Sequence, residues 1–319
     1  MKKLLIYLMI LVGGLIGLMA LFPEQSAKLG IDAERSMSGL GYATVVIGDE
    51  TWHYLEGGPK DAEVVLLLHG FGGDKDNWTR FSKFLTDGYR VIVPDLPGFG
   101  QSTRHPDWDY SLPTQRTRVN GFIQALGLEQ FHVAGHSMGG HLAALYAYTY
   151  PEQVLSMALF NNAGVNAPDE SDMQRALANG NNPLIVKSLE DFDGLLAFAS
   201  YKQPFIPWPL KGVLAQRALD NSAFNESVFK SLMSDSSSNL EPILSDIENP
   251  ALILWGEYDR ILDVSSVNVM RPLLPQSEVV IMKNTGHLPM LERPAETAAH
   301  YLRFLENYAL VERSSQSAI

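Results

Sequence analysis

The pentapeptide Gly-His-Ser-Met-Gly, centred on Ser137, constrains the fold of this chain more than any other stretch. A short, largely apolar run at 131–134 precedes it, and an apolar, helix-forming segment at 141–148 follows directly. A short apolar run is typical of a buried parallel strand, so the motif predicts a sharp turn from strand into helix. Gly135 and Gly139 leave room for such a turn, which would present Ser137 in a strained backbone conformation. The sequence therefore indicates a nucleophile elbow.

Strand-like and helix-like segments alternate along most of the chain. The segments 43–47 and 51–55 flank a Gly-Asp-Glu turn and are expected to pair antiparallel at an edge of the sheet. The other expected strands are 64–68, 90–94, 131–134, 155–160, 251–255 and 278–282. Helices are expected at 114–126 and 295–308. This alternation predicts an α/β fold with a mostly parallel central sheet flanked by helices.

The alternation fails between residues 164 and 249, where helical patches are mixed with prolines and aromatic residues. We interpret 164–249 as a helical cap inserted between two strands of a core formed by 43–163 and 250–312, with 313–319 as a C-terminal tail. Ligands of α/β sheets bind over the carboxyl ends of the strands, so the cap is expected to contribute to a binding pocket. The aromatic residues expected to contact a substrate there are Phe198, Tyr201, Phe205 and Trp208. Plain packing within the cap is the alternative for each of them.

The amino terminus carries Lys2 and Lys3 followed by an uncharged run from 4 to 22. Its length is close to the roughly 20 residues that cross a bilayer and exceeds the roughly 7 to 15 apolar residues of a secretory signal. Residues 1–22 are therefore expected to form an uncleaved transmembrane helix, and a cleaved signal followed by secretion is the alternative. The two lysines would place the rest of the chain on the non-cytoplasmic side, the periplasm in a bacterium. Residues 23–42 are expected to be a linker or a helix lying along the membrane.

Composition excludes several classes of function. The net charge of −12 argues against nucleic acid or an anionic membrane surface as the main electrostatic partner, so any membrane contact is expected to be hydrophobic. The chain has no cysteine, which excludes disulfides, thiolate zinc sites and a cysteine nucleophile. The glycine-rich loop after residue 68 lacks a Gly-Lys-Ser/Thr ending, and no spacing of metal ligands is evident. We expect no metal and no cofactor.

A serine nucleophile needs a base within hydrogen-bond reach and an acid that orients the base. His287 is the expected base, because it alone among the eight histidines lies in a turn after the last expected strand. The carboxylates that compete for the role of the acid are Glu257, Asp259 and Asp263. Asp263 stands before a helix-like segment and is expected to be its N-cap. Asp95, in an earlier loop, is a rival acid.

Five spaced motifs together resemble those of the α/β-hydrolases, and more narrowly those of the bacterial family V lipases and the membrane-anchored monoacylglycerol lipases of eukaryotes. They lie at 69–71, 95–102, 135–140, 256–259, and 286–287 with 292–294. The resemblance covers about residues 43–308 and implies that Asp259, three residues after Gly256, is the acid. Carbon–carbon bond hydrolases and cofactor-free haloperoxidases carry similar strings. In this fold the oxyanion hole comes from the backbone N–H of the residue after the nucleophile, Met138, and of Phe71 in the earlier glycine-rich loop.

The sequence thus predicts a serine carboxylester hydrolase that acts on lipophilic esters, such as acylglycerols, through an acyl-enzyme on Ser137. A carbon–carbon bond or small-ester hydrolase with the same triad is one alternative. A non-catalytic receptor that uses the cap as a ligand pocket is an alternative of another class.

Overall fold

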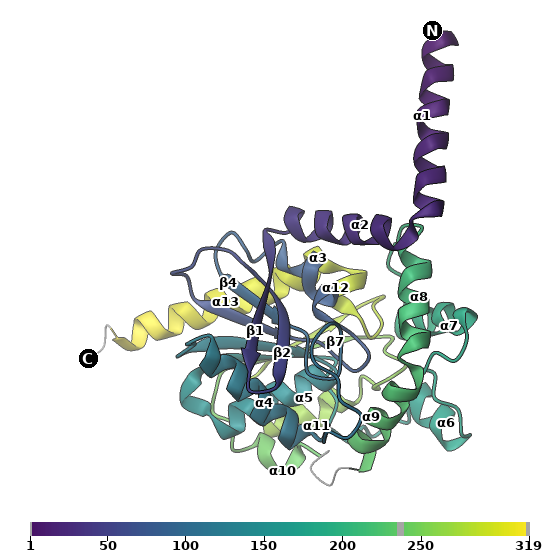
Figure 1. Ribbon diagram of the computed structural model, residues 1–319. Coiled ribbons are helices and arrows are strands. Elements are labelled where there is room, and N and C mark those ends of the chain that lie inside the picture. Colours follow the sequence, from purple (N-terminus) through teal and green to yellow (C-terminus); the bar gives the residue numbers. More distant parts are fainter. Residues whose placement is uncertain (1, 235–238, 317–319) are drawn as a thin grey trace.

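The computed structural model describes residues 2–234 and 239–316, which contain one eight-stranded sheet (Figure 1). The strands are β1 (Leu40–Ile47), β2 (Glu50–Gly57), β3 (Val64–Leu68), β4 (Arg90–Pro94), β5 (Phe131–His136), β6 (Val154–Phe160), β7 (Ala251–Gly256) and β8 (Glu278–Met282). Their order across the sheet is β1-β2-β4-β3-β5-β6-β7-β8. Every segment expected to be a strand is one, which confirms the α/β fold.

The sheet is parallel from β4 to β8, and the pairs β1–β2 and β2–β4 are antiparallel. The expected antiparallel edge is therefore confirmed. Every residue of β3, β5 and β7 is buried, because helices cover both faces of the parallel part. The carboxyl ends of these three central strands consequently meet at one edge of the sheet, where the loops carrying the candidate site begin.

Two apolar cores lie on the two faces of the sheet. One includes side chains from α4 (Leu112–Ala125), α5 (Met138–Thr149) and α11 (Ser266–Leu273). The other includes side chains from α3 (Thr79–Ser82), α12 (Pro289–Glu292) and α13 (Pro294–Gln316). Within the first core, Trp52 of β2 stacks on Phe122 of α4 with ring centroids 4.8 Å apart. Helix α13 continues through residue 316, well beyond the expected end at 308.

The expected N-cap at Asp263 is wrong. Helix α11 begins at Ser266 with Ser265 as its N-cap. Asp263 lies in the preceding turn, where its Oδ1 accepts a hydrogen bond from Ser265 N at 2.9 Å and its carbonyl oxygen accepts one from Ser266 N. An aspartate that closes a turn has the same local sequence signature as one that caps a helix, since both accept from backbone N–H groups.

Five helices occupy the described stretch between β6 and β7. They are α6 (Asp172–Ala178), α7 (Leu189–Ala199), α8 (Leu210–Asp220), α9 (Ser222–Ser234) and α10 (Glu241–Leu244). Helices α7 and α8 share a small apolar cluster of their own that includes Phe192 and Ala215. A second cluster joins this region to the loop after β7, through contacts of Met173 and Ala199 with Ile261. The cap is therefore attached to the core beside the loop that holds Asp259.

Two helices precede the sheet. Helix α1 (Lys2–Leu21) projects away from the rest of the protein, and α2 (Pro23–Met37) lies across its surface, next to α8 (Figure 1). The stretch 23–42, expected to be a linker or a helix lying along the membrane, is a packed helix up to Met37 and enters β1 at Leu40; Ala27, in the second turn of α2, is buried. The expected transmembrane helix is not supported: in the described part of the chain, no helix has both the length and the apolar character that crossing a membrane requires.

Candidate active site

Ser137 occupies a strained turn between β5 and α5. Its backbone has φ 54° and ψ −117°, a conformation that few non-glycine residues adopt. Two hydrogen bonds hold it there: Ser137 N donates to Phe160 O at 3.0 Å, and Ala163 N donates to Ser137 O at 3.0 Å. Both partners come from the end of β6 and the loop after it, so the neighbouring strand maintains the elbow.

The glycines of the motif allow this turn because they leave space for other backbone atoms. A Cβ on Gly135 would lie 2.0 Å from Gly139 O, and a Cβ on Gly139 would lie 2.3 Å from Leu68 O. Real Cβ atoms do not approach that closely, so any side chain at either position would push α5 away from β5 or from β3. The motif therefore fixes the serine at the carboxyl ends of the central strands.

His287 and Asp259 meet in the loops after β8 and β7. His287 Nδ1 and Asp259 Oδ2 are 2.8 Å apart, and both residues are buried. Asp259 Oδ1 accepts hydrogen bonds from Ile261 N at 2.8 Å and Leu262 N at 3.0 Å. Because a carboxylate accepts from the protonated nitrogen, Nδ1 carries the proton and Nε2 is left free to act as a base.

The competing carboxylates have other partners. Glu257 accepts a hydrogen bond from Asn284 N at 3.4 Å, and Asp263 accepts the one from Ser265 N already described. Asp95 forms a buried ion pair with Lys75, with 2.6 Å between Asp95 Oδ2 and Lys75 Nζ. Of the candidate acids, Asp259 is the one that the structure places against His287.

Asn161 is a site residue that the sequence analysis missed. Its side-chain amide donates to Asp259 Oδ2 at 2.7 Å, and its own backbone has φ 45°. Asparagine tolerates this left-handed conformation better than most residues, and it directly follows β6 at the edge where the elbow lies. The residue type and its position directly after β6 were the only signals in the sequence that pointed to Asn161. The amide and the imidazole share one carboxylate oxygen, which fixes the plane of the Asp259 carboxylate.

His136 links the elbow to the loop of His287. Its Nε2 donates to His287 O at 2.7 Å, and the two ring centroids are 4.5 Å apart. Burial, followed by the neighbouring charge of His287, holds the pKa of His136 well below its ordinary value. A neutral imidazole has a single N–H, and here that N–H is committed to the carbonyl. The residue before the nucleophile thus positions the base through its backbone.

Glu292 anchors the same loop from its other side. Its Oε1 accepts from Gly286 N at 2.9 Å, and its Oε2 accepts from Tyr201 N at 2.9 Å and Lys202 N at 3.0 Å. Burial raises the pKa of the Glu292 carboxyl above its ordinary value, although the backbone donors oppose that effect. One carboxylate therefore connects the His287 loop to the segment that follows α7 in the cap.

The two expected oxyanion donors belong to segments next to Ser137. Met138 is the first residue of α5, where backbone N–H groups have no partner within the helix. The loop of Phe71 passes close to the nucleophile, since a Cβ on Gly70 would lie 3.0 Å from Ser137 Cβ. The ring of Phe71 packs edge-on against Phe229 of α9 with centroids 5.4 Å apart. The cap therefore touches the loop that carries one of these donors.

The four aromatic residues expected to contact substrate do not form one cluster. Phe198 packs against the cluster of Met173 and Ile261. Tyr201 is half exposed and lines a cavity of about 440 Å³ beside Asp259. Phe205 and Trp208 are 78% and 56% exposed, so neither is cap core. Their role in binding substrate stays a prediction.

Comparison with known proteins gives consistent matches. The family model for the alpha/beta hydrolase fold matches residues 63–182. Lipase 1 of Psychrobacter immobilis is 37% identical over 276 residues, which cover 86% of this chain and 87% of the relative. A monoacylglycerol lipase of Bos taurus is 30% identical over 270 residues, covering 82% of this chain and 80% of the relative. The crystal structure of a membrane phospholipase A, a bacterial virulence factor, has a TM-score of 0.89 and 47% identity, covering 97% of this chain and 99% of that one.

Proposed function

The chain belongs to the family of proteins with the α/β-hydrolase fold and is a carboxylic ester hydrolase, and from this premise we propose that it cleaves lipophilic esters through an acyl-enzyme on Ser137. The observation that carries the proposal is the buried His287–Asp259 pair, which His136 joins to the strained elbow of Ser137. A strained serine next to an oriented imidazole is the arrangement that acyl transfer requires.

The reaction proceeds in two halves. His287 Nε2 takes the hydroxyl proton as Ser137 Oγ attacks the ester carbonyl, and the same nitrogen returns the proton to the leaving alcohol as the C–O bond breaks. Water then attacks the acyl-enzyme with the same proton transfers, which releases the carboxylic acid and restores the serine. No hydrogen bond joins Ser137 Oγ to His287 among the described residues, and such contacts commonly tighten only when substrate binds.

Two backbone donors stabilise the tetrahedral intermediates. The N–H groups of Met138 and Phe71 are proposed to face the oxyanion, and a donor of this kind contributes about 2.7 to 4 kcal/mol to the transition state. Support comes from the position of Gly70 against Ser137 and from the place of Met138 at the start of α5. Side-chain identity matters less here than the position of the backbone.

The substrates are proposed to be acylglycerols, with glycerophospholipids as the second candidate. The names of the bacterial and bovine relatives support the first, and the 47% identity with a membrane phospholipase A favours the second. The cap residues Phe198, Tyr201, Phe205 and Trp208 are proposed to contact the lipid. The strong exposure of the last two suits contact with a lipid aggregate better than enclosure of one acyl chain.

We further propose that α1 attaches the protein to a membrane. The helix projects from the domain (Figure 1). Its described side chains include the exposed Leu4, Tyr7 and Leu18. A row of exposed apolar side chains is stable against lipid and unstable in water. Placement of the catalytic domain on the non-cytoplasmic side stays a prediction.

Labelling by a fluorophosphonate tests the nucleophile. The full-length protein should be labelled, Ser137→Ala should not, and Ser227→Ala, which removes an exposed serine of the cap, should be labelled like the wild type. Equal labelling of wild type and Ser137→Ala would refute the triad. A folded wild type that takes no label would favour the receptor class.

Hydrolysis of matched monoacylglycerols, diacylphospholipids and p-nitrophenyl esters then decides between the substrate classes. Faster turnover of the acylglycerols supports the first candidate, and faster turnover of the phospholipids supports the second. Cleavage of a vinylogous β-diketone with no turnover of any ester would assign the triad to carbon–carbon bond hydrolysis instead.

A further inference from the structure

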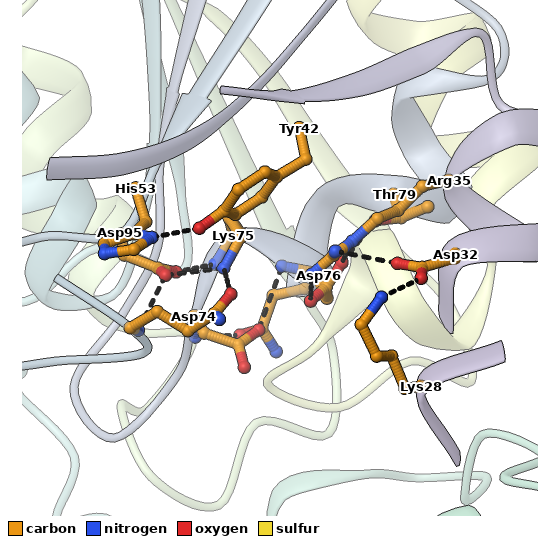
Figure 2. Close-up of polar contacts among 12 residues, drawn as sticks. Lys28, Asp32, Arg35, Tyr42, His53, Asp74, Lys75, Asp76, Thr79 and Asp95 are labelled. Carbon is orange, nitrogen blue, oxygen red and sulfur yellow. Dashed lines mark hydrogen bonds and ion pairs between the residues drawn. The ribbon is translucent and has the colours of Figure 1, made fainter. Parts of the chain in front are cut away.

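Helix α2 is held against the core by an ion pair with two contacts. Arg35 Nε donates to Asp76 Oδ1 at 2.7 Å, and Arg35 Nη2 donates to Asp76 Oδ2 at 2.6 Å (Figure 2). The Arg35 side chain is 12% exposed, so the pair is largely shielded from water. A guanidinium fork that matches both carboxylate oxygens fixes the orientation of its partner as well as its distance.

Asp76 is a few residues from the loop of Phe71, and a series of hydrogen bonds spans the chain between them. Asp76 lies in the short 3₁₀ helix η1 (Lys75–Trp78), and its N–H donates to Asp74 Oδ1 at 2.9 Å. The Asp74 N–H donates to Asn77 Oδ1 at 2.7 Å, which completes a capping box. This box directly follows the turn that Gly70 O closes by accepting from Gly73 N at 3.2 Å. A shift of Asp76 would consequently move the end of the oxyanion loop.

The inner side of η1 has its own anchor. Lys75 N and Lys75 Nζ donate to the two carboxylate oxygens of Asp95 at 2.7 and 2.6 Å, in a site closed to solvent (Figure 2). Asp95 also accepts from Gln101 N at 2.8 Å, so its orientation is set by the core. Thus the core bonds to η1 on its inner side through Asp95, and α2 bonds to it on its outer side through Arg35. Of these two contacts, the one with Arg35 comes from the N-terminal helices.

Helix α2 also joins the core to the cap. Arg80 of α3 donates through Nε to Glu34 Oε1 of α2 at 2.6 Å and through Nη2 to Phe205 O at 2.9 Å. At the other end of α2, Glu24 pairs with Arg217 of α8 at 2.9 Å. Helix α2 is therefore bonded directly to the core and to α8 of the cap, and Arg80 of α3, which it also binds, reaches a second part of the cap.

We propose that Arg35 is a positioning residue for the oxyanion hole, and that α2 is the brace through which it holds the loop of Phe71 in its catalytic position. The inference rests on the proposed function, because it assigns a role to the Phe71 donor. Arg35 acts through Asp76 and the capping box of Asp74, and it touches no reacting atom. Removing the Arg35 side chain leaves the Lys75–Asp95 contacts in place, so the loop stays folded. The N–H of Phe71 is then no longer held in the direction of the oxyanion.

The expected effect lies in turnover rather than in substrate affinity. An oxyanion donor acts on the transition state, and complete loss of one costs about 10² to 10³ in kcat. A donor that is misdirected rather than lost should cost less, about tenfold in kcat with little change in KM.

The test compares full-length variants on a soluble p-nitrophenyl ester, with active sites counted by fluorophosphonate titration. Arg35→Ala and Asp76→Ala should each lower kcat per titrated site about tenfold at nearly constant KM. The double variant should be no worse than either single one, because both remove the same contact. Arg35→Lys, which restores the charge without the fork, should fall between Arg35→Ala and the wild type. Lys28→Ala, which removes an exposed i,i+4 pair with Asp32 on the same helix, should stay within about twofold of the wild type.

Two outcomes would overturn the inference. One is a wild-type kcat per titrated site in Arg35→Ala, whatever its melting temperature, because a brace needed only for stability lowers the number of active sites and not their turnover. The other is additive losses in the double variant, which would separate Arg35 from Asp76. A wild type that neither turns over the ester nor takes the label would refute the proposed function itself, and the two failures are thereby distinguished.

Discussion

The carboxylate of Asp259 accepts hydrogen bonds on both oxygens, from two backbone N–H groups, the amide of Asn161 and the imidazole of His287. These hydrogen bonds fix the orientation of the Asp259 carboxylate, and the carboxylate in turn fixes the orientation of the His287 imidazole. Asp263, four residues further on, accepts its hydrogen bonds within a local turn. The two aspartates therefore differ in what their removal should do.

Asp259→Asn is expected to lower kcat by about 10⁴, because an asparagine at this position favours the wrong imidazole tautomer. Asp263→Asn keeps an acceptor for Ser265 N and should cost at most about 1 kcal/mol of stability. The measurement is kcat on a soluble ester together with the melting temperature of both variants. An inactive Asp263→Asn beside an active Asp259→Asn would reverse the assignment of the acid.

Asp74 gives a prediction on pH. Burial, and then the negative charges of Asp76 and Asp95, raise its pKa to about 7 in the folded protein. The folded state then binds this proton more tightly than the unfolded state, so the contribution of Asp74 to stability falls as the pH rises from about 4 to about 7 and is level above that. Asp74→Asn keeps Oδ1 as an acceptor for Asp76 N and removes the charge.

The melting temperature of Asp74→Asn, relative to the wild type, should therefore be several degrees higher at pH 8 than at pH 5. Asp87→Asn, at an exposed carboxylate, is the control and should show the same difference from the wild type at both pH values. A constant difference for Asp74→Asn as well would mean that this carboxyl does not titrate between the two conditions.

Ser137 and His287 could be predicted because each is defined by its own short stretch of sequence. The elbow is written in five consecutive residues, and the histidine follows the last strand. Asn161 and His136 act through partners 98 and 151 residues away in the chain, and no local pattern encodes such a pairing. The outer anchor of η1 is equally hard to predict, since Arg35 and Asp76 meet only after α2 has docked.

At the level of elements, the strands could be predicted to within three residues at either end, because a short apolar run bounded by turn residues is typical of a strand. The cap was harder to predict from the sequence, because its helices are short and their apolar residues do not follow a single face of each helix. Whether an aromatic side chain there faces the core or the solvent depends on how the helices pack on one another. Phe205 and Trp208 are largely exposed, whereas Phe229, which no sequence pattern singled out, contacts the ring of Phe71, the proposed oxyanion donor.

Substitutions at Phe229, Phe205 and Trp208 should distinguish contact with the acyl chain of the substrate from contact with the lipid aggregate. Phe229→Ala is expected to shift the preferred acyl chain by about two carbons, changing relative kcat/KM about tenfold, since each methylene contributes roughly 0.8 kcal/mol. Phe205→Ala and Trp208→Ala should leave hydrolysis of a soluble short-chain ester unchanged and lower the rate on lipid vesicles several-fold. The measurements are a chain-length profile and a vesicle assay on the same preparations. A Phe205→Ala profile that shifts like that of Phe229→Ala would place both residues on the acyl chain.

At the scale of the whole molecule, the N-terminal helices divide into one that leaves the domain and one that braces it. Helix α1 has exposed apolar side chains, whereas α2 is bonded to the core and to the cap. The apolar run and the two lysines made α1 easy to find in the sequence. The bracing role of α2 could not be read there, because its charged residues look like those of any solvated helix.

Deleting residues 2–21 is expected to move the protein from the membrane to the soluble fraction with kcat and melting temperature unchanged. Deleting residues 2–38 should also lower the melting temperature by several degrees and kcat about tenfold, because Arg35 and the buried Ala27 are then lost. Cell fractionation, activity on a soluble ester and thermal unfolding measure these effects. Full-length protein already in the soluble fraction would contradict attachment through α1, and a native amino terminus near Leu21 or Lys28 would establish cleavage.

The cap divides the core into two stretches of chain, and the proposed catalytic residues are divided with it. Ser137 precedes the cap, while Asp259 and His287 follow strands that are synthesised after it. A growing polypeptide that has reached the end of β6 already has its nucleophile but neither acid nor base. Domains fold as units while they are made from the amino terminus onward, so ester cleavage begins only when β7 and β8 have joined the sheet and α13 has packed against it. The order of translation thus keeps the hydrolase inactive until both segments of its core have been made.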